Sequence, residues 1–149
     1  MNTDIQTLFL SSIPTIVTLI GWYIVNRQNN KRETRKEIRS AADKSKDLLR
    51  EVSINGFEYW QGNPDVPAWK ITSLLGELEV ELCRFPDGKN LQTTLLNILT
   101  DLTDAITGGQ FESKNRPVRT PKDKEMREIA KCRENLLRAI ESKYKEHYS

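Results

Sequence analysis

Residues 67–109, PAWKITSLLGELEVELCRFPDGKNLQTTLLNILTDLTDAITGG, contain two amphipathic helical patterns joined by a tight turn. On both sides of Pro86-Asp87-Gly88, apolar residues recur three or four positions apart, as on the buried face of a helix. Proline, aspartate and glycine together favour a turn, and so short a link places two helices antiparallel. This stretch predicts the helical hairpin at the centre of a small bundle.

The chain before this hairpin continues the helical pattern and then interrupts it. Residues 26–54 carry apolar side chains at helical spacing that alternate with charge, which predicts either an oligomeric stalk or a solvated linker helix. Asn55-Gly56 and Gly62-Asn63-Pro64 are turn signals, so we expect residues 53–67 to break the helix. Asp65 is expected to cap the next helix.

The chain after the hairpin contains one more predicted helix. Gly108-Gly109 ends the preceding helix, and a basic loop follows. Thr120 as N-cap, with Pro121 next, then starts a helix that runs toward the C-terminus. The predicted fold class is therefore mainly α, and a short hairpin between residues 57–60 and 110–119 stays an open alternative.

Residues 5–25, IQTLFLSSIPTIVTLIGWYIV, contain no charged side chain. At about 1.5 Å per residue they would extend through a hydrocarbon core of about 30 Å. Trp22 and Tyr23 end the segment, and six basic residues follow between positions 27 and 39. Pro14 removes a backbone hydrogen bond and favours a kink. This pattern predicts a single-pass helix in the inner (cytoplasmic) membrane, with the N-terminus outside and the remainder cytoplasmic.

The expected organisation has three parts. Residues 1–26 form the transmembrane helix, residues 27–53 a basic juxtamembrane stalk, and residues 54–149 a helical ligand-binding domain. A cleavable signal peptide fits poorly because no basic segment precedes the apolar run and no small-residue cleavage site follows it. A buried core helix fits poorly because of the uncharged length and the basic flank.

Charge is strongly segregated along the chain. Residues 27–39 hold six basic and two acidic side chains, residues 77–104 hold two basic and six acidic, and residues 110–124 hold five basic and two acidic. Such asymmetry points to charged partners. The first block suits anionic lipid headgroups, and the last suits a phosphate-bearing ligand.

The sequence lacks the motifs of common enzymes, so we expect no catalytic residue, cofactor or metal. Two cysteines show no metal-ligand spacing, and His147 is the only histidine. Asp87, Glu112 and Lys114 resemble the set of many Mg²⁺ nucleases, in which the carboxylates hold the metal and the lysine orients or activates water. In those enzymes the residues lie on adjacent strands, whereas here an amphipathic helix separates Asp87 from Glu112, so a nuclease is a minor alternative.

The stronger candidate for a binding surface is the basic loop before the last helix. Its cations lie within a few residues of Pro117 and Pro121, which stiffen the loop. Arginine binds phosphate bidentately, and the amides at the start of the helix favour the same anion. Aromatic rings earlier in the chain would stack on nucleobases, although a core position is the alternative for them. The predicted ligand-binding residues are Lys114, Asn115, Arg116, Arg119, Lys122, Tyr59 and Trp60.

In layout, this chain resembles the small membrane-anchored effectors of type III CRISPR antiviral defence that sense cyclic tetra-adenylate. The resemblance rests on the apolar segment 5–25, its basic flank 27–36, and the compact domain with the loop 114–119. It implies a homotetramer that binds a cyclic oligonucleotide, but no duplex nucleic acid, and then perturbs the membrane or opens a pore. The alternatives are a membrane-anchored assembly subunit without a nucleotide ligand and a toxin-like peptide that damages membranes without a ligand.

Overall fold

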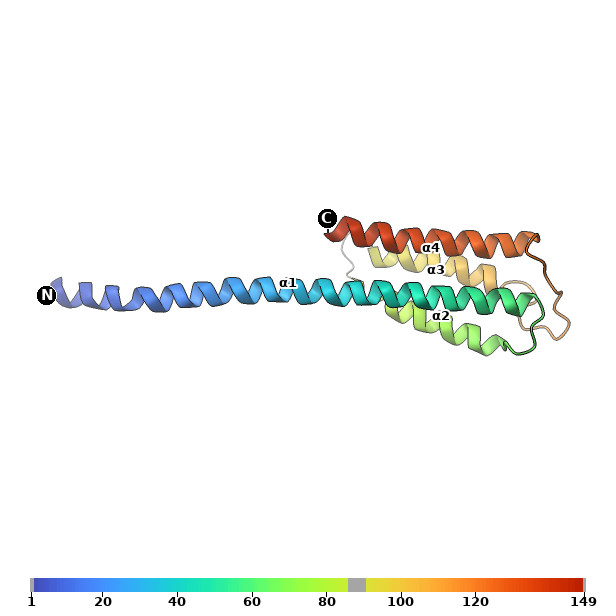
Figure 1. The fold of residues 1–149 in the computed structure, drawn as a ribbon, viewed down its shortest axis with the longest axis horizontal. Helices are drawn as coiled ribbons and strands as arrows, with labels where there is room; N and C mark the ends of the chain where they lie inside the picture. Colours follow the sequence, from blue (N-terminus) through green and yellow to red (C-terminus); the bar gives the residue numbers. More distant parts are fainter. Residues whose placement is uncertain (1, 86–90, 149) are drawn as a thin grey trace. The chain divides into compact units, whose positions relative to one another are not determined.

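The computed structural model describes residues 2–85 and 91–148, with side chains from Val17 onward except at 91, 143 and 146–148. The described residues form four α-helices and no strand, and Figure 1 labels each helix. Two compact units make up the chain, Met1–Glu37 and Ile38–Ser149. The helices are α1 (Asn2–Trp60), α2 (Ala68–Leu82), α3 (Leu91–Thr107) and α4 (Lys124–Tyr148).

The unit Ile38–Ser149 is a helical bundle around one apolar core. The later part of α1 lies beside α2, α3 and α4 in Figure 1, and every helix contributes fully buried side chains. Burying each leucine or isoleucine stabilises the fold by about 1.5–3 kcal/mol. The largest fully buried apolar side chains are Leu49, Val52, Ile71, Leu78, Leu82, Leu95, Leu102, Ile106, Ile129, Leu136 and Ile140.

Helix α1 does not break where the turn signals predicted. It continues through Asn55-Gly56 to Trp60, so residues 57–60 form its last turn, and no strand pairs them with residues 110–119. The side-chain amide of Asn55 (Nδ2) donates a hydrogen bond to the backbone carbonyl of Glu51 within the helix, at 2.8 Å. A Cβ at Gly56 would lie 3.5 Å from Ile106, an ordinary van der Waals contact, so this part of α1 packs against α3. Tertiary packing overrides the local turn preference.

The other helix boundaries lie close to their predicted positions. Helix α2 begins after Pro67 rather than at a cap formed by Asp65, and no side chain caps it. Helix α3 ends at Thr107, where the Gly108 amide donates to the Asp104 carbonyl and Gly109 takes a φ of +67°. Helix α4 begins at Lys124, later than predicted from Thr120. The predicted turn at residues 86–88 lies outside the described residues.

The predicted transmembrane helix is wrong. Across the part of the chain that the structure describes, no helix has both the length and the apolar content that crossing a bilayer requires. The expected single-pass, inner-membrane location is therefore not supported, and the side chain of Pro14 lies outside the described set.

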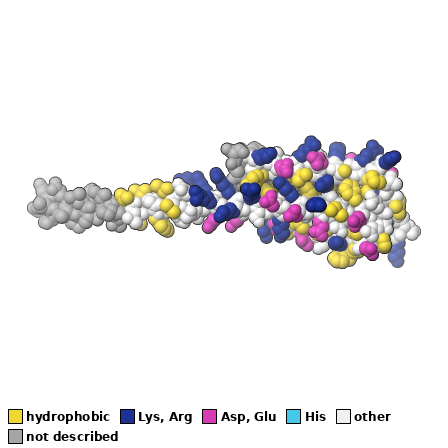
Figure 2. Space-filling view, viewed as in Figure 1, with side chains coloured by type: hydrophobic (Ala, Val, Ile, Leu, Met, Phe, Trp, Pro, Cys, Tyr) yellow, Lys and Arg dark blue, Asp and Glu magenta, His cyan; other side chains and the backbone are white. Residues whose placement is uncertain are grey.

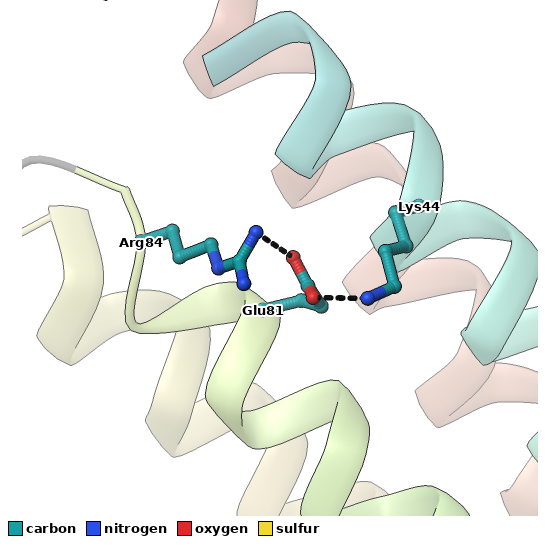
Figure 3. Close-up of polar contacts among 3 residues, drawn as sticks. All are labelled: Lys44, Glu81 and Arg84. Atoms are coloured by element: carbon teal, nitrogen blue, oxygen red, sulfur yellow. Dashed lines mark hydrogen bonds and ion pairs between the residues drawn. The ribbon is translucent and has the colours of Figure 1, made fainter. Parts of the chain in front are cut away.

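A buried carboxylate joins α2 to α1. Glu81 is 3% exposed, and its two oxygens face two cations (Figure 3). Lys44 Nζ of α1 lies 2.5 Å from Oε1, and Arg84 Nη1 lies 3.3 Å from Oε2. Both cations are more than half exposed, so only the carboxylate is desolvated. The two cations therefore stabilise the fold chiefly because the Glu81 carboxylate would lower the free energy of unfolding if it were buried without a partner.

We expect the double variant Lys44→Met/Arg84→Met to lower the free energy of unfolding by about 1–3 kcal/mol, because it leaves the Glu81 carboxylate buried without a cation. Adding Glu81→Gln to the same chain should restore part of this loss. Urea unfolding followed by far-UV circular dichroism measures both. The matched control is Lys131→Met, which removes an exposed ion pair with Glu128 and should change stability by less than about 0.5 kcal/mol.

Candidate functional site

Tyr59 and Trp60, the last two residues of α1, belong to the core of the bundle. The Tyr59 hydroxyl donates to the Phe111 carbonyl, and Trp60 Nε1 donates to the Ile106 carbonyl at 2.9 Å. The Phe111 ring lies 4.8 Å from the Tyr59 ring, centroid to centroid. Both side chains are at most 4% exposed. Neither ring offers an open face for a nucleobase in this structure.

The two arginines of the basic loop pack onto these rings. Arg116 Cζ lies 4.0 Å from the Tyr59 ring centroid, and its Nε donates to the Tyr59 carbonyl at 3.3 Å. The Arg119 amide donates to the Trp60 carbonyl at 2.7 Å, and its guanidinium lies 5.5 Å from the Trp60 ring. Positive charge beside the last carbonyls of a helix is favourable, as is a cation over an aromatic face. The arginines thus hold the loop against the end of α1.

Near the start of α4, the hydrogen-bond donors that could bind an anion are already paired with acidic side chains of the same chain. The Thr120 amide donates to Asp123 Oδ2 at 2.6 Å, and Arg119 Nη1 pairs with Glu125 Oε1 at 2.7 Å. An anion approaching these donors would compete with two carboxylates. The other predicted members of the loop, Lys114, Asn115 and Lys122, are exposed.

A cavity of about 540 Å³ lies between this loop, the end of α3 and α4. Trp60, Arg119 and Lys124 line it, together with the acidic side chains of Asp104, Glu125 and Glu128. Arg119 Nε is buried without a hydrogen-bond partner among the described atoms. The acidic groups outnumber the basic ones, so the cavity itself is not a strongly cationic site.

A second cavity, of about 510 Å³, is a groove between α2 and α3 that the sequence did not predict. Leu75, Leu99 and Phe111 contribute to it, and Glu79 and Glu112 are its acidic residues. Its α2 side includes Gly76, where a Cβ would meet nothing within 4 Å. Its remaining members are Thr72, Thr103, Thr107 and Gly109. No local pattern marks this groove, because it forms from residues on two helices and a loop.

The unit Met1–Glu37 exposes a concentrated group of apolar side chains. Seven of the nine residues at positions 17–25 are large and apolar, and each is 49–66% exposed. Figure 2 shows these side chains and, next along α1, a band of lysine and arginine. Trp22 and Tyr23 are among them. A helix that is apolar on all sides normally buries that surface against something.

Among the described residues, no group of three or more histidine, cysteine, aspartate or glutamate side chains has the arrangement of a metal site. Glu112 and Lys114 of the nuclease-like pattern are exposed, and Asp87 lies outside the described residues. Burial and the nearby Glu128 and Asp101 raise the pKa of the Cys132 thiol, so less of the reactive thiolate is present.

No protein-family model, curated protein or solved structure matches this chain. The resemblance to CRISPR effectors in layout therefore stays a prediction without independent support.

We expect Arg116→Ala to lower the free energy of unfolding by about 1 kcal/mol, because it removes the cation–π contact and the bond to the Tyr59 carbonyl. Lys114→Ala, at an exposed position of the same loop, is the matched control and should change stability by less than about 0.5 kcal/mol. Thermal and urea unfolding of the full chain measure both. Equal stability of the two variants would contradict a structural role for Arg116.

Proposed function

We propose that this protein is a non-catalytic interaction subunit that binds a protein partner through the exposed apolar segment of α1, residues 17–25. The single observation that carries this proposal is the exposure of seven large apolar side chains within nine positions. Scattered exposed apolar residues are ordinary, whereas a contiguous group marks a contact surface.

The energetics favour a covered segment. Fully burying a large apolar side chain contributes about 1.5–3 kcal/mol, and these side chains are roughly half exposed. Covering all seven would then contribute on the order of 10 kcal/mol. Association costs about 4–15 kcal/mol in lost freedom and ordering. The segment alone therefore supplies energy of the size that a specific complex needs, and the basic residues beside it add charge selectivity.

This proposal predicts that a photo-crosslinking residue placed in the segment captures one discrete protein. Benzoylphenylalanine replaces Leu19 or Tyr23, which lie one helical turn apart, in the full chain expressed in its native host. We expect one adduct band at both positions, at least about tenfold stronger than at Asp47, an exposed α1 position in the other unit.

Adducts of equal strength at Asp47 would indicate random collision. No protein adduct at either apolar position would overturn the proposal.

A second candidate function, nucleotide binding at the basic loop, is favoured by one specific feature. The cavity beside Trp60 contains Arg119, whose buried Nε has no hydrogen-bond partner among the described atoms, and the exposed Lys114 and Lys122 belong to the same loop. Two lysines and one arginine suit a phosphodiester better than a single cation does. A cyclic oligoadenylate is the ligand that the layout resemblance implies.

If this second function holds, Lys114→Ala/Lys122→Ala weakens the binding of cyclic tetra-adenylate at least about tenfold, because two phosphate contacts are lost. Isothermal titration calorimetry of the full chain measures the affinity. Arg50→Ala, which removes an exposed cation on α1, is the control. Absence of binding by the unmodified chain, or equal affinity in the lysine variant, would exclude this function.

A further inference from the structure

We propose that the partner of residues 17–37 is a second copy of this chain, and that the segment docks in the groove between α2 and α3 of that copy. This inference rests on the proposed interaction function and names its partner. Three properties of the groove carry it: its shape, its apolar residues and its charge.

The groove has the form that a helix needs for close approach. Gly76 leaves open space where any larger residue would place a side chain, and Thr72 lies one turn before it on α2. Leu99 and Thr103 of α3 are one turn apart on the other side. Small residues on a helix surface allow a second backbone to come near, and the cavity of about 510 Å³ gives room for large side chains.

The apolar surface extends beyond the groove along α2. Trp69 and Val80 are 70% and 60% exposed. Trp69, Gly76 and Val80 follow one another at intervals of seven and four residues, so they share one face of the helix. This face is long enough to receive more than a single side chain. Residues 17–25 present apolar side chains over about two and a half helical turns, a comparable length.

Charge complementarity selects a second copy as the occupant. The titratable groups that line the groove are Glu79 and Glu112. Residues 27–39, which directly follow the apolar segment, hold six basic and two acidic side chains. One chain thus contains both an apolar helix with a basic extension and a groove with acidic residues, beside which Trp69 and Val80 are exposed. Opposite charges at the rim of such a contact fix its register and oppose other partners.

The proposed contact joins the segment of one copy to the groove of the other. If two copies exchange their segments reciprocally, the arrangement closes as a dimer with two identical contacts. The predicted oligomer is then a discrete, salt-sensitive species and not an open chain of copies. Exposed ion pairs weaken as ionic strength rises.

Sedimentation equilibrium of the full chain tests this assignment by charge exchange. We expect Glu79→Lys/Glu112→Lys to raise the dissociation constant of the dimer about tenfold, and Arg32→Glu/Lys36→Glu to do the same. Combining all four substitutions in one chain exchanges the charges and should restore most of the affinity. Asp47→Lys/Glu51→Lys, with the same charge change on an exposed part of α1, should leave the constant unchanged.

Disulfide crosslinking provides a second measurement that does not depend on the charge variants folding well. Copies carrying Trp22→Cys are mixed with differently tagged copies carrying Gly76→Cys, with the exposed Cys83 replaced by serine in both. We expect a mixed disulfide between the two tags, and none when Asp47→Cys replaces Gly76→Cys. Disulfides only between two Trp22→Cys copies would show that the segment pairs with itself and would overturn the groove assignment.

The sedimentation and crosslinking results distinguish a failure of the second copy as partner from a failure of the proposed interaction function. A chain that stays monomeric at all concentrations overturns the second copy as partner, and a photo-adduct to a different protein would still support the interaction function. A dimer in which the four-substitution chain regains no affinity overturns the pairing of the basic segment with the acidic groove. A dimer with restored affinity and the mixed disulfide supports both.

Discussion

The closure of the C-terminal end of α1 is the constraint on which the bundle and the basic loop both depend. Trp60 takes part in two hydrogen bonds there: its indole Nε1 donates to the Ile106 carbonyl of α3, and its own carbonyl accepts from the backbone amide of Arg119. The Tyr59 hydroxyl donates a hydrogen bond to the Phe111 carbonyl, and the Arg116 guanidinium makes a cation–π contact with the Tyr59 ring. The last turn of α1 therefore contacts both the end of α3 and the loop that leads to α4.

This closure changes how the basic loop is understood. In the sequence, Arg116 and Arg119 look like phosphate ligands, but in the fold each is engaged by the end of α1, and Arg119 also by Glu125. The cations that face solvent are Lys114 and Lys122. Because the arginines already neutralise helix carbonyls and a carboxylate, a ligand at this loop would depend mainly on the lysines and on the cavity beside Trp60.

Two surfaces of the chain combine exposed apolar side chains with neighbouring charge. They are the segment 17–25 and the part of α2 beside the groove between α2 and α3. The segment exposes seven large apolar side chains beside a mainly basic stretch, and Trp69 and Val80 are exposed on the face of α2 beside the acidic groove. The basic border lies on residues 27–39, and the acidic border lies on Glu79 and Glu112. Joining them removes apolar area from water and pairs the charges, which is why contact between copies is our preferred account of both features.

The sequence alone determined the helices of the bundle, because the spacing of apolar residues in α2, α3 and α4 already marks which faces are buried, and Gly108-Gly109 ends α3 where expected. It did not determine the length of α1, since Asn55-Gly56 signals a turn locally, whereas in the fold both residues stay within α1 and Gly56 lies against Ile106. It also placed an apolar segment in a membrane, which the structure does not support. Only the tertiary structure decided the roles of Tyr59, Arg116 and Glu81, because their partners lie 37 to 57 positions away in the chain and no local pattern records such contacts.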